Sequence, residues 1–439
     1  EGGISSPYEN DITTTGNNSA ISILTDVTMG SNNGGGFDYN VARISTTGND
    51  SGITLVGDFT VNTNHVASGE AVAFNITTTG TDSDISHSGG TISMNDDVGN
   101  ETLNISTANT GSGITLGNIS ATTIDLTSSA GSITFDSITS TGGGDITLTS
   151  AGTIDDTDDT GHNISTTGNL TLTSNGIIGG GTAQGLNINA DKTSVTSTGG
   201  NDLTLTDSFQ DFETGNISTG GGGDINLNGY DWGVYVYGDV TTQDDINLIG
   251  STNVHFDWSG PKLVSSTGGG NITVHASNNL NLYNGGAFQT NGGNITITTQ
   301  RFNANNAGSF IDAGTGNITL NSNATNGTIN VNTSSAYNAD TASVMDLNQF
   351  EMGLFSGNSL TINSSNGTGV IDVATVLDTS ATGLDLDLNL TATGDITSSI
   401  VGNALTAGAN DITITAGGDI DFATANMSST GDITLTATG

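Results

Sequence analysis

The chain has 439 residues, among them 65 Gly, two Pro and no Cys, and 33% of its residues are hydrophobic. Its 44 acidic residues are opposed by only four Lys and Arg, which gives a formal net charge of −40. Because so negative a surface repels phosphate groups, binding to nucleic acid or to anionic membranes is excluded. Without Cys, disulfide bonds and thiolate metal sites are excluded as well. No run of about 18 apolar residues occurs, so membrane insertion is not expected.

The first predicted strand, at residues 10–15, reads NDITTT and shows a phrase that returns along the whole chain. The phrase is one or more Gly, then Asp or Asn, then apolar residues that alternate with Thr, Asn or Ser. Further copies are GGGDITLTS at 142–150, TGNLTLTS at 167–174, NDLTLTD at 201–207, GGGDINLN at 221–228, DDINLIG at 244–250, GGGNITVHA at 268–276, GGNITITTQ at 292–300, TGNITLNS at 315–322, NDITITA at 410–416 and GDITLTATG at 431–439. Alternation with period two is typical of a β-strand, so Ile146 and Leu148 are expected on one face and Thr147 on the other. Gly with Asn or Asp predicts a turn before each strand.

The spacing of these copies selects among β-architectures. In six pairs of neighbouring copies the first apolar residues lie 21 to 26 residues apart, as between Ile225 and Ile246. Weaker strands, such as 117–120 and 123–127, lie between copies. Such intervals match one coil of a solenoid and are too short for a propeller blade of about 40–45 residues. No 3.6-residue apolar period persists, so helix is not expected.

We therefore predict an all-β fold, a right-handed parallel β-helix with about 20 coils of about 21–26 residues. Each strand would pair with the equivalent strand of the coils above and below it. Residues 1–439 would form a single continuous β-solenoid, with residues 230–263 as an atypical aromatic-rich segment within it.

The same phrases carry a resemblance to a known family. The GDITLTS-type copies, with TTGNLTLTSNGIIGGG at 166–181, resemble the repeat region of filamentous-haemagglutinin-type exoproteins and related adhesins. The resemblance covers most of the chain and implies a secreted β-solenoid that acts at a cell surface. The secretion domain of that family, with its Asn-Pro-Asn motifs, has no counterpart in this sequence. The chain would correspond to the stalk alone.

Four acidic residues in one short stretch are candidate oxygen ligands for Ca²⁺, namely Asp155, Asp156, Asp158 and Asp159. Their spacing matches neither an EF-hand nor a calcium β-roll, so solvated loop acids are the alternative, and no cofactor is required. The nearby His162 suggests a polygalacturonase-like hydrolase, but the paired Asp should precede that His by about one coil. We therefore expect no enzymatic activity.

Residues 230–263 hold both Trp of the chain and three of its seven Tyr. The candidate ligand-binding residues are Asp231, Trp232, Tyr235, Tyr237, Asp257 and Trp258. The two Asp-Trp dipeptides are 26 residues apart, about one coil, which predicts that they stack on neighbouring coils. Adjacent exposed indoles would pack against sugar rings while Asp accepts hydrogen bonds from their hydroxyls. The alternative is an aromatic plug in the core, although the alternation of Val and Tyr at 234–237 favours exposure.

These patterns together predict an extracellular structural protein, a β-solenoid stalk or filament subunit at a cell surface. Because the first and last phrases would each leave an unpaired strand edge, the expected partner is a second copy of the chain stacked head to tail, or the next part of a longer chain. The alternative function is that of an adhesin that binds surface glycans through the aromatic segment 230–258.

Overall fold

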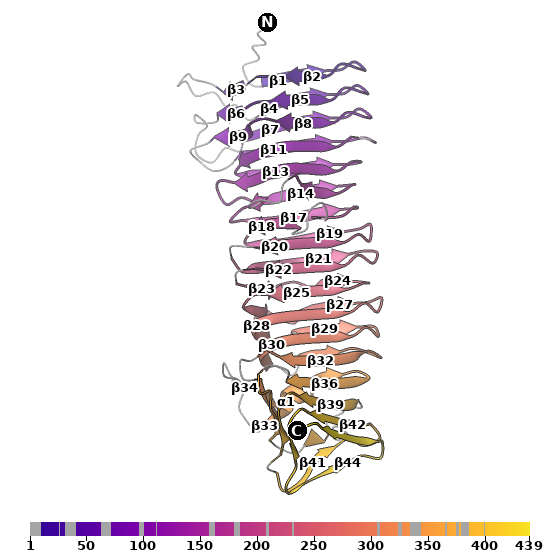
Figure 1. Cartoon of the computed structure of the whole chain (residues 1–439). Helices are drawn as coiled ribbons and strands as arrows, with labels where there is room; N and C mark the ends of the chain where they lie inside the picture. Colours follow the sequence, from indigo (N-terminus) through magenta and orange to yellow (C-terminus); the bar gives the residue numbers. More distant parts are fainter. Residues whose placement is uncertain are drawn as a thin grey trace. The chain divides into compact units, whose positions relative to one another are not determined.

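The structure, a computed structural model, describes residues 10–25, 27–30, 41–62, 72–95, 101–110, 112–157, 163–179, 185–207, 210–230, 232–304, 308–323, 327–333, 344–364, 367–374, 377–378, 386–398 and 400–439. It is all-β, with parallel strands stacked as a β-solenoid, so the predicted fold class is confirmed (Figure 1). The chain divides into two compact units, Glu1–Ser208 with Thr219–Gly221, and Phe209–Ser218 with Gly222–Gly439. The single continuous solenoid stays a prediction.

Three ladders of parallel strands form the first unit. The first ladder contains β1 (Asn10–Thr14), β4 (Val41–Thr46), β7 (Val72–Thr78), β10 (Glu101–Thr107), β12 (Thr123–Ser128), β14 (Ile146–Ser150), β17 (Asn169–Ser174) and β19 (Lys192–Ser197). The second contains β2 (Ile21–Ile23), β5 (Ile53–Val56), β8 (Ile85–Ser88), β11 (Ile114–Ala121), β13 (Ile133–Ser140) and β15 (Ile154–Asp156). The third contains β3 (Val27–Gly30), β6 (Phe59–Asn62), β9 (Thr91–Asn95), the second halves of β11 and β13, β16 (Ile164–Ser165), β18 (Leu186–Asn189) and β20 (Leu203–Asp207).

The second unit also consists of parallel ladders. Its longest ladder contains β22 (Ile225–Gly229), β25 (Ile246–Gly250), β28 (Ile272–Leu282), β30 (Ile295–Ala304), β32 (Asn317–Ser322), β36 (Ser359–Ser364), β39 (Asp387–Ala392), β42 (Ile412–Ala416) and β45 (Ile433–Ala437). The next contains the first half of β21 (Phe212–Thr219), β23 (Gly233–Val236), β26 (Asn253–Phe256) and the second halves of β28 and β30. The third contains the second half of β21, β24 (Val240–Thr242), β27 (Leu263–Ser266), β29 (Ala287–Thr290), β31 (Phe310–Asp312) and β35 (Phe355–Ser356).

Smaller sheets and one short helix complete the second unit. One sheet contains β34 (Val344–Asn348), β33 (Thr328–Thr333), β37 (Ile371–Val373), β40 (Ile396–Thr397) and β43 (Ile420–Asp421). Another contains β38 (Leu377–Asp378), β41 (Gly402–Thr406) and β44 (Ala425–Ser428). Within the described ranges α1 (Gln349–Met352) is the single helix, so the expectation of a nearly helix-free chain is met.

The repeated phrase forms the predicted strands. In β14 the side chains of Ile146 and Leu148 are fully buried, whereas Thr147 is half-buried on the other face. Ile146 pairs with Leu170 of the next coil, which stacks apolar side chains in the core. The phrase is not confined to one ladder, however. The copy in β20 pairs with β18 through Leu205, in the third ladder of the first unit.

The Asp or Asn of each phrase has a structural role. In several copies its side-chain oxygen accepts a hydrogen bond from the backbone N–H of the equivalent residue in the next coil. The donor–acceptor distances in four successive coils are 3.1 Å from Asp245 to Asp224, 2.7 Å from Asn271 to Asp245, 2.9 Å from Asn294 to Asn271 and 3.0 Å from Asn317 to Asn294. In these coils the Asp or Asn before the strand supplies the acceptor for the backbone of the next coil.

Coil length varies more than the spacing of the phrases predicts. Within the three ladders of each unit, equivalent residues of neighbouring coils lie 19 to 33 residues apart in the first unit and 20 to 44 apart in the second. Across an interval of 42 residues Asn363 still donates a hydrogen bond to Asn321 at 3.1 Å. The additional residues thus lie outside the ladders and leave the strand register intact. Because many coils are longer than 26 residues, the structure has fewer coils than the predicted number of about 20.

Candidate functional site

Strands β23, β26 and the second half of β28, all in the second unit, place three outward side chains in register. Tyr235 pairs with His255, and His255 pairs with Asn281. The neighbouring Val234 and Phe256 are fully buried, because successive residues of a strand alternate between the two faces of the sheet. The predicted alternation of Val and Tyr in this segment is therefore confirmed.

Five rings from three coils form one cluster, here called the aromatic face, consisting of Tyr235, Tyr237, His255, Trp258 and Tyr283. The Tyr235 ring stacks on His255 with centroids 5.0 Å apart, and on Tyr237 at 6.5 Å. The Tyr283 ring meets His255 edge-on at 4.9 Å and stacks on Trp258 at 4.2 Å. Aromatic pairs in these geometries attract each other beyond simple burial, so each ring helps to hold the next.

A tight turn positions Tyr283 beneath Trp258. The backbone N–H of Gly286 donates to the carbonyl of Tyr283 at 2.9 Å. Asn284 and Gly285 lie between them with φ of 47° and 90°, the left-handed conformation that an Asn-Gly pair adopts readily. A Cβ atom on Gly286 would lie 2.6 Å from the core ring of Phe256. Only glycine therefore lets this turn approach the core closely enough to place the tyrosine.

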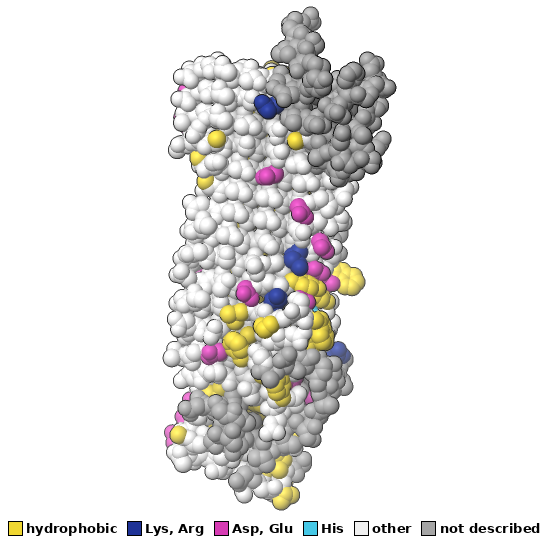
Figure 2. Space-filling view, turned by 180° about the vertical axis from the view of Figure 1, so that it is seen from behind, with side chains coloured by type: hydrophobic (Ala, Val, Ile, Leu, Met, Phe, Trp, Pro, Cys, Tyr) yellow, Lys and Arg dark blue, Asp and Glu magenta, His cyan; other side chains and the backbone are white. Residues whose placement is uncertain are grey.

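Trp258 is the exposed member of the aromatic face. Its side chain is 58% exposed, whereas Tyr283 beneath it is 8% exposed. The side-chain amide of Asn284 donates to the backbone carbonyl of Trp258 and links the two coils. The buried phenol thus supports one face of the indole and leaves the remainder to solvent. Figure 2 shows that hydrophobic side chains gather most densely in one area of this face of the molecule, with acidic and basic side chains beside them.

Carboxylates lie beside the aromatic face. Glu213 is the cross-strand neighbour of Tyr235. Burial raises the pKa of Tyr235, and the carboxylates of Asp211 and Glu213 raise it further because they oppose a second negative charge. Burial lowers the pKa of His255, an effect that Asp257 opposes. Near neutral pH the face therefore presents uncharged rings next to negative carboxylates.

The predicted stack of the two tryptophans is wrong. Trp232 is also 58% exposed, but its carbonyl accepts a hydrogen bond from Thr252 at 2.7 Å, which places it before the start of β26. Trp258 instead follows the end of β26. A spacing of 26 residues instead separates Trp258 from Asn284, which lies in the coil that follows. Because both indoles are exposed, the core plug is also wrong, and Asp231 lies outside the described residues.

Two members of the aromatic face were not predicted from the sequence, His255 and Tyr283. The available signal for Tyr283 was the Asn-Gly pair directly after it, which indicates a tight turn one coil beyond Asp257. The predicted Asp257 does lie at this site, where its backbone N–H donates to Val236 at 3.1 Å and its carboxylate accepts from the Ser259 hydroxyl.

The predicted calcium cluster is divided between two faces of a strand. Asp155 is half-buried and Asp156 is buried, because successive side chains of β15 point in opposite directions. The Asp155 carboxylate accepts a hydrogen bond from the backbone of Asp156 at 3.1 Å, and the two carboxylates do not converge on one ion. Asp158 and Asp159 lie outside the described residues. The described residues contain no group of three or more His, Asp and Glu that could hold a metal, and Ca²⁺ binding stays a prediction.

Comparisons with known proteins gave no match. No protein-family model matches the chain, and neither a curated protein nor a solved structure matches it. The resemblance to filamentous-haemagglutinin-type exoproteins therefore stays a prediction based on the repeated phrases. Within the described ranges, none of the helical structure has the length and apolar character needed to cross a membrane.

Proposed function

We propose that this protein is an extracellular β-solenoid that binds glycans through the aromatic face. The observation that carries the proposal is the indole of Trp258, which is 58% exposed and stacks at 4.2 Å on the buried ring of Tyr283. Sugar rings have apolar faces formed by C–H groups, and a supported indole offers a flat apolar surface to them. The carboxylate of Asp257 beside the indole can accept hydrogen bonds from hydroxyl groups at the rim of such a ring.

The charge around the aromatic face selects among glycans. Asp211 and Glu213 act on Tyr235, Asp257 acts on Tyr237 and His255, and the whole chain has a net charge of −40. Sulfated and uronic-acid-rich chains would meet like charge here without a compensating cluster of Lys or Arg. The proposed ligands are therefore neutral glycans.

In this proposal the solenoid acts as a rigid support for the aromatic face. Parallel ladders place the rings of neighbouring coils at a fixed spacing of roughly 5 Å, so the aromatic face needs little reorganisation when a ligand binds. A ladder that keeps its register across a coil of 42 residues also suits a stalk that presents a binding surface away from a cell. Head-to-tail association of copies stays a prediction.

A glycan array tests the proposal with two matched variants. Trp258→Ala removes the supported indole, and we expect binding to neutral glycans to fall by at least about tenfold, as for other anchoring Trp side chains. Trp232→Ala removes an indole of equal exposure outside the aromatic face and should bind like the wild type. Melting curves of both variants control for folding. Unchanged binding by a folded Trp258→Ala protein would show that the aromatic face is not the binding surface.

A further inference from the structure

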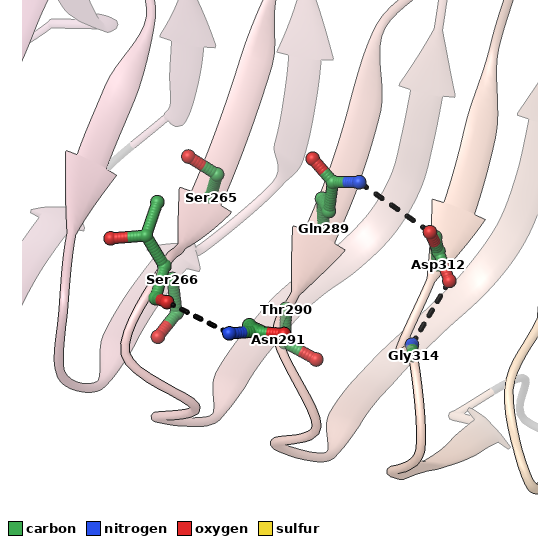
Figure 3. A pocket seen from close by; sticks show the side chains of 8 residues that line it. Ser265, Ser266, Gln289, Thr290, Asn291, Asp312 and Gly314 are labelled. Atoms are coloured by element: carbon green, nitrogen blue, oxygen red, sulfur yellow. Dashed lines mark hydrogen bonds between the residues drawn. The ribbon is translucent and has the colours of Figure 1, made fainter.

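A second surface of the second unit carries a polar groove, separate from the rings of the aromatic face. The groove has a volume of about 360 Å³, and its wall includes Ser265, Gln289 and Asp312, from β27, β29 and β31 (Figure 3). Ser265 pairs with Gln289, and Gln289 pairs with Asp312. Three consecutive coils thus contribute a hydroxyl, an amide and a carboxylate to one outward column. Figure 3 shows these groups side by side along the groove.

The Ser265 hydroxyl is the least satisfied group in the groove. Its residue is 3% exposed, and within the described residues the hydroxyl has no hydrogen-bond partner. The neighbouring Ser266 differs, because its hydroxyl donates to the carbonyl of Gln243 at 3.3 Å. Thr290 likewise donates to Gly293 at 2.6 Å. The Ser265 oxygen is not sealed from solvent, so a ligand group that enters the groove can reach it and form the hydrogen bond that the protein does not supply.

The amide and carboxylate of the column are already oriented. Gln289 donates to one oxygen of Asp312 at 3.4 Å, and the backbone N–H of Gly314 donates to the other at 2.9 Å. Each carboxylate oxygen accepts more than one hydrogen bond, so both remain able to receive ligand hydroxyls. A single carboxylate with no Lys or Arg in the lining disfavours anions, and one carboxylate is too few for a Ca²⁺ site.

An apolar column runs beside the polar one. Leu263 pairs with Ala287 and Ala287 with Phe310, each two residues before the matching member of the polar column and hence on the same side of its strand. Phe310 is 37% exposed, so part of its ring faces solvent. Ala287 is buried, so the ring of Phe310 supplies the apolar contact beside the row of donors and acceptors, as a ligand with C–H faces and a hydroxyl rim requires.

We infer that this groove binds a neutral oligosaccharide that lies across the three coils. The column from Ser265 to Asp312 spans two coil-to-coil steps, on the order of 10 Å, which suits a short chain of sugars rather than one ring. The inference shares with the proposed function only the class of ligand, a neutral glycan. It uses none of the residues of the aromatic face.

The test measures binding to an array of neutral gluco-, manno- and galacto-oligosaccharides from dimers to hexamers, followed by calorimetry with the strongest of them. Ser265→Ala should weaken binding about five- to tenfold, the effect of one lost hydrogen bond, and Asp312→Asn should weaken it at least as much. Thr241→Ala is the matched control, since Thr241 precedes Ser265 in the same outward column but does not line the groove. The melting midpoint of Ser265→Ala should not fall, because the hydroxyl has no partner in the protein to lose.

Each outcome decides a different point. Wild-type affinity in the folded Ser265→Ala and Asp312→Asn variants would overturn the proposal that the groove binds oligosaccharide. If Trp258→Ala also lost binding, the aromatic face would be the only binding surface of the two. Loss in the groove variants with full binding by Trp258→Ala would support the groove and overturn the proposed function of the aromatic face. Absence of binding by the wild-type protein at millimolar oligosaccharide would overturn both. A lower melting midpoint for Ser265→Ala together with unchanged affinity would assign Ser265 to structure alone.

Discussion

His255 lies between two tyrosines, with its ring centroid 5.0 Å from Tyr235 and 4.9 Å from Tyr283. Burial lowers its pKa below the ordinary value of 6.5, against the opposing effect of the Asp257 carboxylate. Trp258 is the remaining ring beside it, at 6.5 Å. The folded state therefore favours the neutral imidazole. Between the lowered pKa and 6.5 the unfolded chain binds more protons than the folded one, so this residue contributes stability that declines as pH falls.

The His255→Gln variant tests this at the level of one residue. Wild-type stability should be full above pH 6.5 and should decline as pH falls from there through the lowered pKa of His255. The variant lacks the titrating group, so the difference in melting midpoint between the two proteins should change across that window and be constant above it. Melting curves at closely spaced pH values measure the difference. A difference that is independent of pH would contradict the role of His255.

The sequence predicted which side chains of a strand face outward or inward. It did not predict which side chains of the next coil lie beside them. Alternation alone placed Tyr235 outside and Val234 inside. Which residue of the next coil lies beside a side chain depends on the length of that coil, and the sequence does not show where a coil gains or loses residues. For this reason Trp258 was paired with Trp232 when its actual partner is Tyr283.

At the scale of elements, α1 shows how one insertion is joined to the solenoid. The side chain of Asn348 accepts hydrogen bonds from Phe350 and Glu351, and Glu351 in turn accepts from the backbone of Asn348 at 3.0 Å, which forms a capping box. Glu351 is 1% exposed, and its other oxygen accepts from the backbone of Ala304 in β30 at 3.0 Å. One carboxylate therefore serves the helix and a strand of the solenoid together.

Glu351→Ala should destabilise the second unit by about 2 kcal/mol or more, because it leaves the buried backbone N–H of Ala304 and the half-buried one of Asn348 without their acceptor. Gln349→Ala on the exposed side of the same helix is the control and should change stability by less than about 0.5 kcal/mol. Chemical denaturation of both variants, compared with the wild type, gives the values. Equal midpoints for the two variants would show that the carboxylate does not join the helix to β30.

The strands were predictable, whereas the elements between them were not. Gly, Asp or Asn and a period of two mark most strands of the longest ladder, so β22, β25 and β32 coincide with copies of the phrase. The region between β32 and β36 lacks the phrase and contains β33, β34, α1 and the two-residue β35 instead. Its signal was the Asn-x-x-Glu spacing of residues 348–351, which is too short to predict a helix without a following apolar period.

At the scale of the whole molecule, charge is the dominant property, with 44 acidic and four basic residues. Because Asp and Asn take the same place before each strand, carboxylates come to lie above one another. The backbone of Asp411 donates to the Asp387 carboxylate at 2.8 Å, and that of Asp432 donates to Asp411 at 2.7 Å. Carboxylates on neighbouring coils are roughly 5 Å apart, so like charges repel along the column. Dissolved salt screens such exposed charges.

We therefore expect the melting midpoint of the wild-type protein to rise with NaCl concentration. Asp411→Asn keeps an acceptor oxygen for Asp432 but removes the central charge, so it should raise stability in low salt by up to about 1 kcal/mol, the scale of an exposed charge pair. This advantage should shrink as salt is added, because screening already relieves the repulsion in the wild type. Asn294→Asp, between Asn271 and Asn317, is the control, since its neighbours in the column carry no charge. A wild-type midpoint that is independent of salt, with no gain from Asp411→Asn, would show that the hydrogen-bonded carboxylates do not repel each other measurably.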